Sequence, residues 1–242
     1  MNVHHACHIK LNTWLRSRSR SNSTQQRAAK RVIAYWEKRV EVFGEDKAFL
    51  PLTLAGALKD DTRALRVGFS VPIPNMRDDA GRAIFFADPS RYPADIGHES
   101  FDVHSMARSF WYFLHSVLED EEVQKKGCVV VSDLTNIKPF HFDRKLAALQ
   151  LHSVRSCIPL KIVKMHICHP PWFLQVVYPC MKLMMGERLR RKVKLHAEEY
   201  ESILQTLEVK YGISRDKLPV EMGGGLTLDH IEWLEERKKL GL

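Results

Sequence analysis

Side chains that could bind a metal ion or take part in catalysis gather in three places along this chain. The first group, His4, His5, Cys7 and His8, lies in a polar, irregular segment without a scaffold, so we interpret it as part of a disordered tail rather than a zinc site. The sequence has no Gly-x-Ser-x-Gly elbow, no Gly-x-x-x-x-Gly-Lys loop and no Gly-x-Gly-x-x-Gly after a strand. We therefore expect no resident metal, no catalytic residue and no enzymatic activity.

The second and third groups lie at the ends of two predicted strands. Asp133 follows the apolar run 128–131 and could bind a ligand at the carboxyl edge of a sheet, although we favour an aspartate that caps a turn or helix. Among His166, Cys168 and His169, only His166 and Cys168 share a face of a strand, and a third metal ligand is not evident. We expect these side chains to pack in the core or at the edge of the sheet.

The segment that should position a binding site is the apolar stretch 170–186. Large side chains occupy nearly every face of the helix that it predicts, so this helix must be covered all round by protein or lipid. Pro179 predicts a kink, and the pliable Met181, Met184 and Met185 suit a surface that repacks around varied apolar partners. An ordinary buried core helix would have the same composition.

A basic cluster follows this helix directly, and its members are Arg188, Arg190, Arg191, Lys192 and Lys194. Cations beside an apolar helix are typical of surfaces that dock on anionic bilayers, where each cation contributes about 1 kcal/mol. A solvated, charged face is the alternative interpretation.

Composition limits the class of partner. The net charge of +8, from 37 Lys and Arg against 29 Asp and Glu, favours an anionic partner, either nucleic acid or an acidic membrane. The Arg-Ser segment 16–23 fits the first of these, but strands with aromatic stacking residues are missing, so we expect no nucleic acid.

Cysteine usage and hydropathy indicate the compartment. The five cysteines are scattered and contain no Cys-x-x-Cys pair, which indicates reduced thiols. No apolar run reaches the ~18 residues of a membrane span, and the first residues lack the apolar core of a secretory signal. We expect a cytoplasmic monomer.

Strands and helices alternate along most of the chain. After a basic tail that is disordered or partly helical, at 1–23, helical periodicity runs from Thr24 to the stop at Gly44. The predicted strands are 83–87, 128–131, 161–168 and 190–196, and the predicted helices between and after them are 101–118, 142–156, 171–185 and 197–209. This alternation predicts an α/β sheet with crossover connections.

Several motifs in this order resemble the CRAL-TRIO lipid-binding domain. They are Gly127–Asp133, Ile158–Lys161 with Met165–Pro170, Phe173–Lys182, Arg191–Val193 and Leu218–Gly224. The resemblance spans residues 64–226, and the helix from Ala28 to Trp36 is similar to the small helical domain that the family carries in front of it. It implies a tail at 1–23, a shortened helical domain at 24–63, the lipid-binding domain at 64–226 and a C-terminal helix at 227–242.

The resemblance implies a mixed, largely parallel β-sheet that floors a deep apolar pocket, with residues 171–185 as a gating helix. Such a protein binds one hydrophobic lipid, a phospholipid or an isoprenoid, and carries it between membranes without covalent chemistry and without a cofactor. The expected pocket and lid residues are Phe110, Phe113, Val117, Val129, Val131, Val163, Met165, Ile167, Phe173, Val176, Val177, Cys180, Met181 and Met184. The expected headgroup-binding or membrane-binding residues are Lys161, Arg188, Arg190, Arg191, Lys192 and Lys194, which would hold the protein transiently on an anionic membrane.

Two departures from the family pattern bear on the ligand and the hinge. Family members that bind phosphatidylinositol resemble one another in a glutamate after the proline that opens the third strand and in a lysine on the following basic strand. Lys192 matches that lysine, but Leu160 stands at the position of the glutamate, and Leu183 replaces a proline after the gating helix.

A protein-interaction module of the same fold is the alternative function, for example a regulator of a small GTPase or another signalling protein, because a fold does not fix a function. A pocket smaller than the few hundred Å³ of ordinary ligand sites would favour this alternative.

Overall fold

The computed structural model describes residues 22–94 and 101–242. Nearly all of the predicted tail 1–23, including the cluster from His4 to His8, lies outside these described residues.

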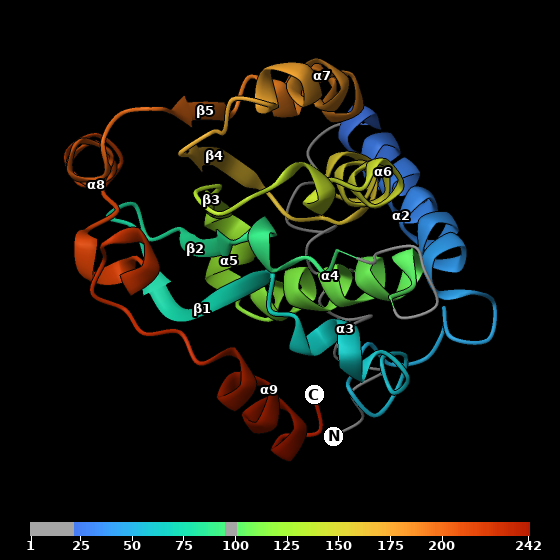
Figure 1. Ribbon diagram of the computed structural model, residues 1–242. Helices are drawn as coiled ribbons and strands as arrows, with labels where there is room; N and C mark the ends of the chain where they lie inside the picture. The colour runs from blue at the N-terminus through green and yellow to red at the C-terminus, as the bar shows by residue number, and fades with distance from the viewer. Residues whose placement is uncertain (1–21, 95–100) are drawn as a thin grey trace.

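A five-stranded sheet forms the centre of the molecule, with its strands in the order β1-β2-β3-β4-β5 (Figure 1). The strands are β1 (Ser70–Arg77), β2 (Ala83–Ala87), β3 (Cys128–Asp133), β4 (Ile162–Cys168) and β5 (Val193–His196). β1 pairs with β2 in antiparallel orientation, and all other neighbours are parallel. The predicted α/β class with a mixed, largely parallel sheet is confirmed.

β3 shows why the sheet is buried on both faces. All of its residues are buried, as the unbroken apolar run predicts for a strand that is covered on two sides. Because side chains alternate along a strand, Cys128 and Val130 join one hydrophobic core, while Val129 and Val131 join another.

The crossover helices all lie over one face of the sheet. α4 (Val103–Leu118) and α5 (Glu121–Lys126) connect β2 to β3, and α6 (Arg144–His152) connects β3 to β4 together with the π-helical turn η3 (Ser153–Cys157). α7 (Leu174–Arg190) connects β4 to β5. Parallel neighbours joined in sequence by right-handed crossovers place their helices on the same side, and residues of α4, α6 and α7 share one core with that face.

A second, smaller layer covers the other face (Figure 1). It contains α8 (Tyr200–Tyr211) and the short 3-10 turns η4 (Arg215–Lys217) and η5 (Val220–Met222). Ile203, Leu204 and Leu207 of α8 pack against the side chains of Ile84 and Val131 from the sheet. Two further 3-10 turns, η1 (Pro89–Arg91) and η2 (Pro139–His141), follow β2 and β3.

The remaining helices pack around α4. They are α2 (Asn22–Phe43), α3 (Thr62–Arg66) and α9 (His230–Lys239), and the last lies within the predicted helix 227–242. Tyr35 of α2 belongs to the same core as Trp111 of α4, with ring centroids 5.2 Å apart. The domain boundaries at residues 63 and 226 stay a prediction.

Buried polar contacts fix these helices to α4. Arg108 donates to both carboxylate oxygens of buried Asp61, at 2.8 and 2.7 Å. At the other end of α4, Arg237 of α9 donates to both oxygens of Glu119, at 2.6 and 2.7 Å. Bidentate, charge-assisted bonds of this kind set orientation as well as energy, so the positions of α3 and α9 are defined by α4.

The structure corrects some predicted boundaries. The predicted strand 190–196 is shorter, because α7 continues to Arg190 and β5 begins at Val193. β1 and α5 were not predicted.

No helix in residues 22–94 and 101–242 is long and apolar enough to cross a bilayer.

Buried neutral histidines make acid destabilisation an expected property. Burial lowers the pKa of His115 to about 4, and burial with neighbouring His196 lowers that of His166 to about 3. The unfolded chain, with pKa values near 6.5, then binds more protons than the folded chain below that pH. We expect the contribution of these histidines to the free energy of unfolding to be complete above pH ~7. It should fall by about 1.4 kcal/mol per pH unit for each histidine as the pH drops from ~6.5 towards 4. Urea unfolding at several pH values measures this slope, and a flat profile between pH ~7 and 5 would contradict it.

Candidate functional site

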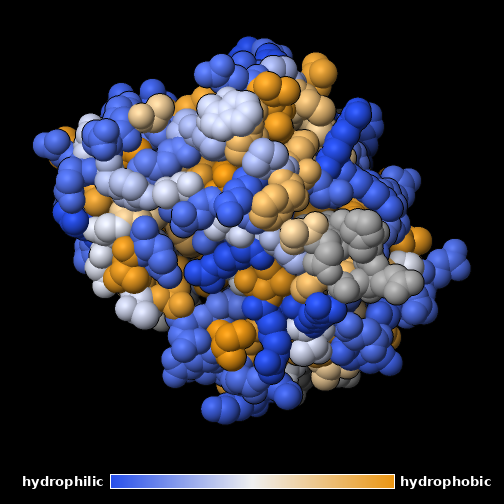
Figure 2. All heavy atoms as spheres, viewed as in Figure 1, coloured by the Kyte–Doolittle hydropathy of each residue, from blue (hydrophilic) through white to orange (hydrophobic). Residues whose placement is uncertain are grey.

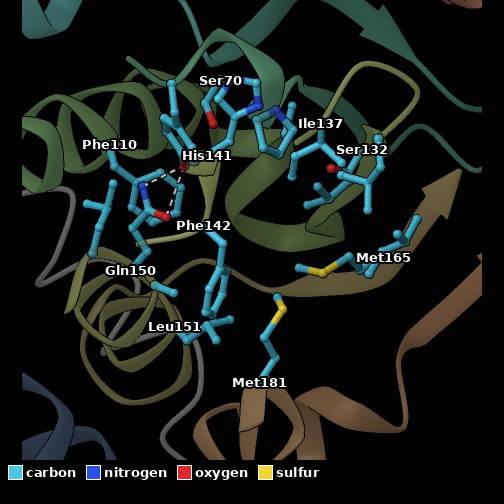
Figure 3. Close-up of a pocket in the computed structure, with 18 of the residues that line it drawn as sticks. Ser70, Phe110, Ser132, Ile137, His141, Phe142, Gln150, Leu151, Met165 and Met181 are labelled. Atoms are coloured by element: carbon cyan, nitrogen blue, oxygen red, sulfur yellow. Dashed lines mark hydrogen bonds between the residues drawn. The ribbon is translucent and has the colours of Figure 1, made fainter. Parts of the chain in front are cut away.

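A cavity of about 200 Å³ lies between the sheet and the helices α4, α6 and α7. Its walls are mostly apolar, and β2, β3, β4 and all three helices contribute to them. In Figure 3 the side chains of Met165 on β4 and Met181 on α7 extend toward each other across this space. The cavity therefore lies on the face of the sheet where a ligand would contact the floor and the helices together.

The structure brings some of the predicted pocket residues to this cavity and places others elsewhere. Those that line it are Phe110, Met165, Ile167, Phe173, Val177 and Met181. Those outside its lining are Phe113, Val117, Val129, Val131, Val163, Val176, Cys180 and Met184.

The sheet residues were assigned to the wrong face for an identifiable reason. Val129 and Val131 belong to the core beneath α8, and Val130 and Ser132 line the cavity instead. An all-apolar strand does not indicate which of its faces meets the ligand. On β4, the pairing shifts between Ile162 and Lys164, so that a bulge displaces Val163 from the cavity wall.

Two residues of α4 are core residues rather than wall residues. The ring of Phe113 packs against Phe69, with centroids 5.7 Å apart, and against Trp233 of α9 at 6.0 Å. Val117 is also buried in this core. Neither Phe113 nor Val117 lines the cavity, because α4 is covered on both sides, and the residues of α4 that reach the cavity are Phe110 and Leu114.

α7 forms one wall of the cavity and has two distinct faces. An inward stripe with a four-residue spacing, Phe173, Val177, Met181 and Met185, lines the cavity. An outward set is mostly exposed, with Trp172 at 78%, Val176 at 75% and Leu183 at 81%. Hydrophobic side chains are visible at the surface where α7 lies (Figure 2). We call residues 170–185 the lid.

Residues with positive φ lie at both ends of the lid. His169, at φ 52, precedes it, and its Nδ1 lies 3.0 Å from Oδ1 of Asp133. Asp133 also accepts hydrogen bonds from the backbone and hydroxyl of Thr135, so the turn-capping interpretation of this aspartate is confirmed. Gly186, at φ 67, follows the lid and interrupts α7, while Arg155 donates to the carbonyl of Met184 at 3.0 Å.

The predicted headgroup or membrane cations are not part of the cavity wall; these residues are Lys161, Arg188, Arg190, Arg191, Lys192 and Lys194. Lys161 lies directly before β4, and Arg188 lies in α7. The other four were predicted on the strand 190–196, but Arg190 ends α7, Arg191 and Lys192 form the following turn, and Lys194 alone of the four lies in β5.

Lys192 is the most buried of these cations. Its ammonium group donates to the carbonyl of Ile162, and burial, followed by the charges of Arg188 and Lys161, lowers its pKa. Leu160, which replaces the glutamate that the resemblance led us to expect there in a phosphatidylinositol-binding member, is buried in the core.

The polar residues at the cavity were missed by sequence reasoning. They are Ser70 of β1, Tyr92, Ser132 of β3, His141, Asp143 and Gln150 of α6. The helical spacing of Leu146, Ala147, Gln150, Leu151 and Val154 on one face of α6 and its continuation could have indicated Gln150. No comparable signal was available for Ser70, because Pro72 and Pro74 obscure β1 as a strand.

The described part of the chain shows no metal centre, and its three buried cysteines are not activated thiols. No group of three or more His, Cys, Asp and Glu residues there could hold a metal ion. Burial raises the pKa of Cys128 and of Cys168 to about 12, and it raises that of Cys157 as well. These thiols stay protonated near neutral pH, whereas a nucleophilic cysteine needs a lowered pKa. His166 and His196 are buried in the core, where Nδ1 of His166 lies 2.9 Å from Nε2 of His196.

Comparison with known proteins identifies relatives of most of the chain. The model of the CRAL/TRIO domain matches residues 70–224. Tyrosine-protein phosphatase non-receptor type 9 of Homo sapiens is 25% identical over 162 residues, which are 66% of this chain and 25% of the phosphatase. Clavesin-2 of Homo sapiens is 23% identical over 216 residues, which are 88% of this chain and 60% of clavesin-2. Clavesin-1 of Xenopus laevis is 27% identical over 168 residues, which are 68% of this chain and 47% of clavesin-1.

The chain thus spans between a quarter and about three fifths of the length of these relatives. Among solved structures, the crystal structure of Sfh5 superposes with a TM-score of 0.49 at 10% identity, over 89% of this chain and 81% of that chain.

The end of the lid provides a test of its attachment. Replacing Gly186 with alanine forces a side chain into a backbone conformation, φ 67 and ψ 165, that is essentially restricted to glycine, at a cost of about 1–3 kcal/mol, and brings a Cβ atom within 3.1 Å of Arg155 Cδ. We expect faster amide hydrogen exchange in residues 174–185 of this variant. The matched control is Gly241→Ala, where φ is 70 and nothing lies within 4 Å, so the lid should exchange as in the parent. Equal exchange of the lid in all three proteins would contradict a role of Gly186 in holding it.

Proposed function

The chain belongs to the CRAL/TRIO domain family, and on that premise we propose that it binds one lipid molecule in the cavity under α7 and carries or presents it between membranes. The observation that carries this proposal is the apolar cavity between the sheet and a helix whose inner stripe is separate from its exposed outer stripe. The proposal involves no covalent chemistry, because transfer of an acyl chain requires shelter from water rather than bond cleavage.

The size of the cavity sets a condition on loading. Its volume of about 200 Å³ is below the ~300–1,000 Å³ of ordinary ligand pockets. A lipid would therefore have to displace the lid or repack the flexible side chains of Met165, Met181 and Met185, which are suited to this. Within the lid, the buried side chains are Phe173, Leu174 and Met185, so we expect few core contacts to oppose its displacement.

The outer face of the lid supports a role in membrane contact. Trp172, Val176 and Leu183 already face solvent in this closed arrangement, so they could enter the interface of a bilayer without unfolding any core. Exposed Arg188 and Arg190 at the end of α7 would add attraction to anionic lipids, at about 1 kcal/mol each.

A protein-interaction module of the same fold is the second candidate, and the small cavity favours it. If the described side chains of the cavity keep it closed, the exposed face of the lid would instead contact a protein partner, such as a small GTPase or another signalling protein.

Lipid extraction of the purified full chain followed by mass spectrometry separates the candidates. A stoichiometric lipid supports the first. A protein that contains no lipid and also takes up none from vesicles would contradict lipid binding and favour the protein-interaction module.

Neighbouring valines of the lid offer a matched test of the cavity. Val177 lines the cavity and Val176 is 75% exposed, so Val177→Trp should fill the space while Val176→Trp should not. We expect at least a severalfold lower lipid content after vesicle loading for Val177→Trp, with parent-like content for Val176→Trp, measured by native mass spectrometry. Equal lipid content in both variants would place the lipid outside this cavity.

A second valine pair tests the membrane-facing surface. Val176→Asp puts a carboxylate on the outer face of the lid and should weaken sedimentation with anionic vesicles by about tenfold or more. Val209→Asp on α8 makes the same change at a valine that is 80% exposed on the opposite layer, and it should bind vesicles like the parent. Equal loss in both variants would indicate a general effect of charge, and no loss in Val176→Asp would remove the lid from the docking surface.

A further inference from the structure

A second hollow, with a volume of about 310 Å³, lies between α3, α9 and the segment 54–59 that precedes α3. It shares no residue with the cavity under α7, and its volume reaches the ~300–1,000 Å³ of ordinary binding pockets. Figure 1 shows α3 and α9 at the same end of the molecule, below α4. We call this hollow the α3–α9 groove.

The floor of the groove is apolar and lies deep. Leu58, Leu65 and Leu234 are buried, and Ile231, which is 42% exposed, adds an apolar side chain nearer to the solvent. A flat surface such as a bilayer does not reach buried side chains of this kind, whereas the side chains that project from a helix can enter a hollow. The shape of the groove therefore favours a narrow protein segment over a membrane.

Cations border this floor. Lys59, Arg66 and Lys238 line the groove, and all three are exposed. Arg66 has an acidic neighbour, because its Nη2 lies 3.9 Å from Oε1 of Glu235, which also lines the groove. Within residues 22–94 and 101–242, neither of the two lysines forms an ion pair. Two ammonium groups without an ion-pair partner, beside an apolar floor, favour a ligand that carries carboxylates beside apolar side chains.

The walls of the groove are held in place by hydrogen bonds. Nε2 of His230 on α9 lies 2.6 Å from the carbonyl oxygen of Leu65 on α3, so this nitrogen carries the proton and donates the bond. The backbone N–H of Leu54 donates to the carbonyl oxygen of Leu242 at 3.2 Å, which connects the segment 54–59 to the residues after α9. A groove that is formed in advance costs less to bind, because few of its own groups have to be ordered.

The spacing of the lining residues indicates the kind of segment that fits. On α9 they are Ile231, Leu234, Glu235 and Lys238, which share one face of the helix at i, i+3, i+4 and i+7. This face covers about two helical turns, or ~10 Å at 1.5 Å per residue. A partner helix of similar length, with apolar residues at the same spacing and acidic residues beside them, matches both the floor and the cations.

We propose that the α3–α9 groove docks a short, acidic, amphipathic helix of another protein. The apolar side chains of this helix contact Leu58 and Leu234, and its carboxylates pair with Lys59 and Lys238. The Arg-rich segment 16–20 of the chain itself has the wrong charge for this groove, and two copies of a chain with a net charge of +8 repel each other. The inference does not depend on lipid binding, because the groove and the cavity have no residue in common.

A designed peptide tests the groove directly. The probe is a fluorescein-labelled helical peptide with leucines at i, i+3, i+4 and i+7 and glutamates at the positions between them. Its controls are a peptide with lysines in place of the glutamates and a scrambled peptide of the same composition. Titrated with the full chain near pH 7, the acidic probe should show saturable fluorescence anisotropy with a Kd of about 100 µM or tighter. Each control should bind at least about tenfold more weakly.

Two adjacent lysines of α9 form a matched pair for the cations of the groove. Lys238 lines the groove and Lys239 does not, although both are exposed and lie in the last turn of the same helix. Lys238→Glu should weaken binding of the acidic probe by about fivefold, because an attraction becomes a repulsion, and Lys239→Glu should bind it like the parent. Both substitutions change the net charge and the end of the helix alike, so a difference between them reports the groove.

Ile231 and Leu240 form the corresponding pair for the apolar floor. Ile231 lines the groove, whereas Leu240, which is 71% exposed at the end of α9, does not. Ile231→Ser should weaken binding of the acidic probe by about fivefold, because the leucines of the probe lose an apolar contact. Leu240→Ser should leave the Kd unchanged. Circular dichroism melting confirms that each variant is folded.

The controls separate the ways in which the proposal could fail. Equal binding of the acidic and the scrambled peptide, or equal loss in Lys238→Glu and Lys239→Glu, would overturn it in favour of non-specific attraction between charges. A parent chain that binds no acidic probe but sediments as a dimer, and that becomes a monomer in Ile231→Ser, would make a second copy the occupant. Loss of binding to anionic vesicles in Lys238→Glu, without binding of the probe to the parent, would make the groove a membrane-docking surface. None of these results changes the expected lipid content of the cavity.

Discussion

The order of strands in the sheet is the constraint on which the rest of the molecule depends. Neighbours in the sheet are neighbours in sequence, and from β2 onward they are parallel, so right-handed crossovers put α4, α6 and α7 on the same face. The cavity lies in the space between the sheet and α4, α6 and α7, the last of which is the final crossover helix. The positions of the cavity and of the lid thus follow from the strand order, and individual side chains then shape the cavity wall.

α4 converts this topology into a rigid frame. It is buried against the sheet on one side and against α2, α3 and α9 on the other, and bidentate arginine-carboxylate bonds hold both of its ends. α7 has no comparable support, because its outer face is in solvent. Support is therefore distributed unequally between crossover helices of the same face, which suits the proposed site, whose floor would stay fixed while its cover moves.

Sequence patterns predicted most of this architecture and only part of the site. β2 was located because the turn residues 78–81, Asp-Asp-Ala-Gly, and Asp88-Pro89 mark its ends, and the helix ending at Gly44 because its apolar residues keep one period. The cavity wall was harder for a physical reason. Val129, Val130 and Val131 are equivalent in composition, and a bulge at Val163 shifts the alternation on β4, so the cavity-facing side is set by packing rather than by pattern. The polar end of the cavity, Ser70 with Tyr92 and Gln150, joins segments far apart in sequence, and a one-dimensional pattern does not bring them together.

The hairpin of β1 and β2 has a consequence for how the chain acquires its fold. It is the most local pairing in the sheet, closed by a short turn at residues 78–82, so it costs the least chain entropy to form. Each later strand then adds at the open edge, and none has to insert between two strands that are already paired. The sheet can grow in the direction of synthesis, with β5 and the lid arriving last. The nascent chain would thus complete its floor and its central helix before the segment that closes the cavity exists.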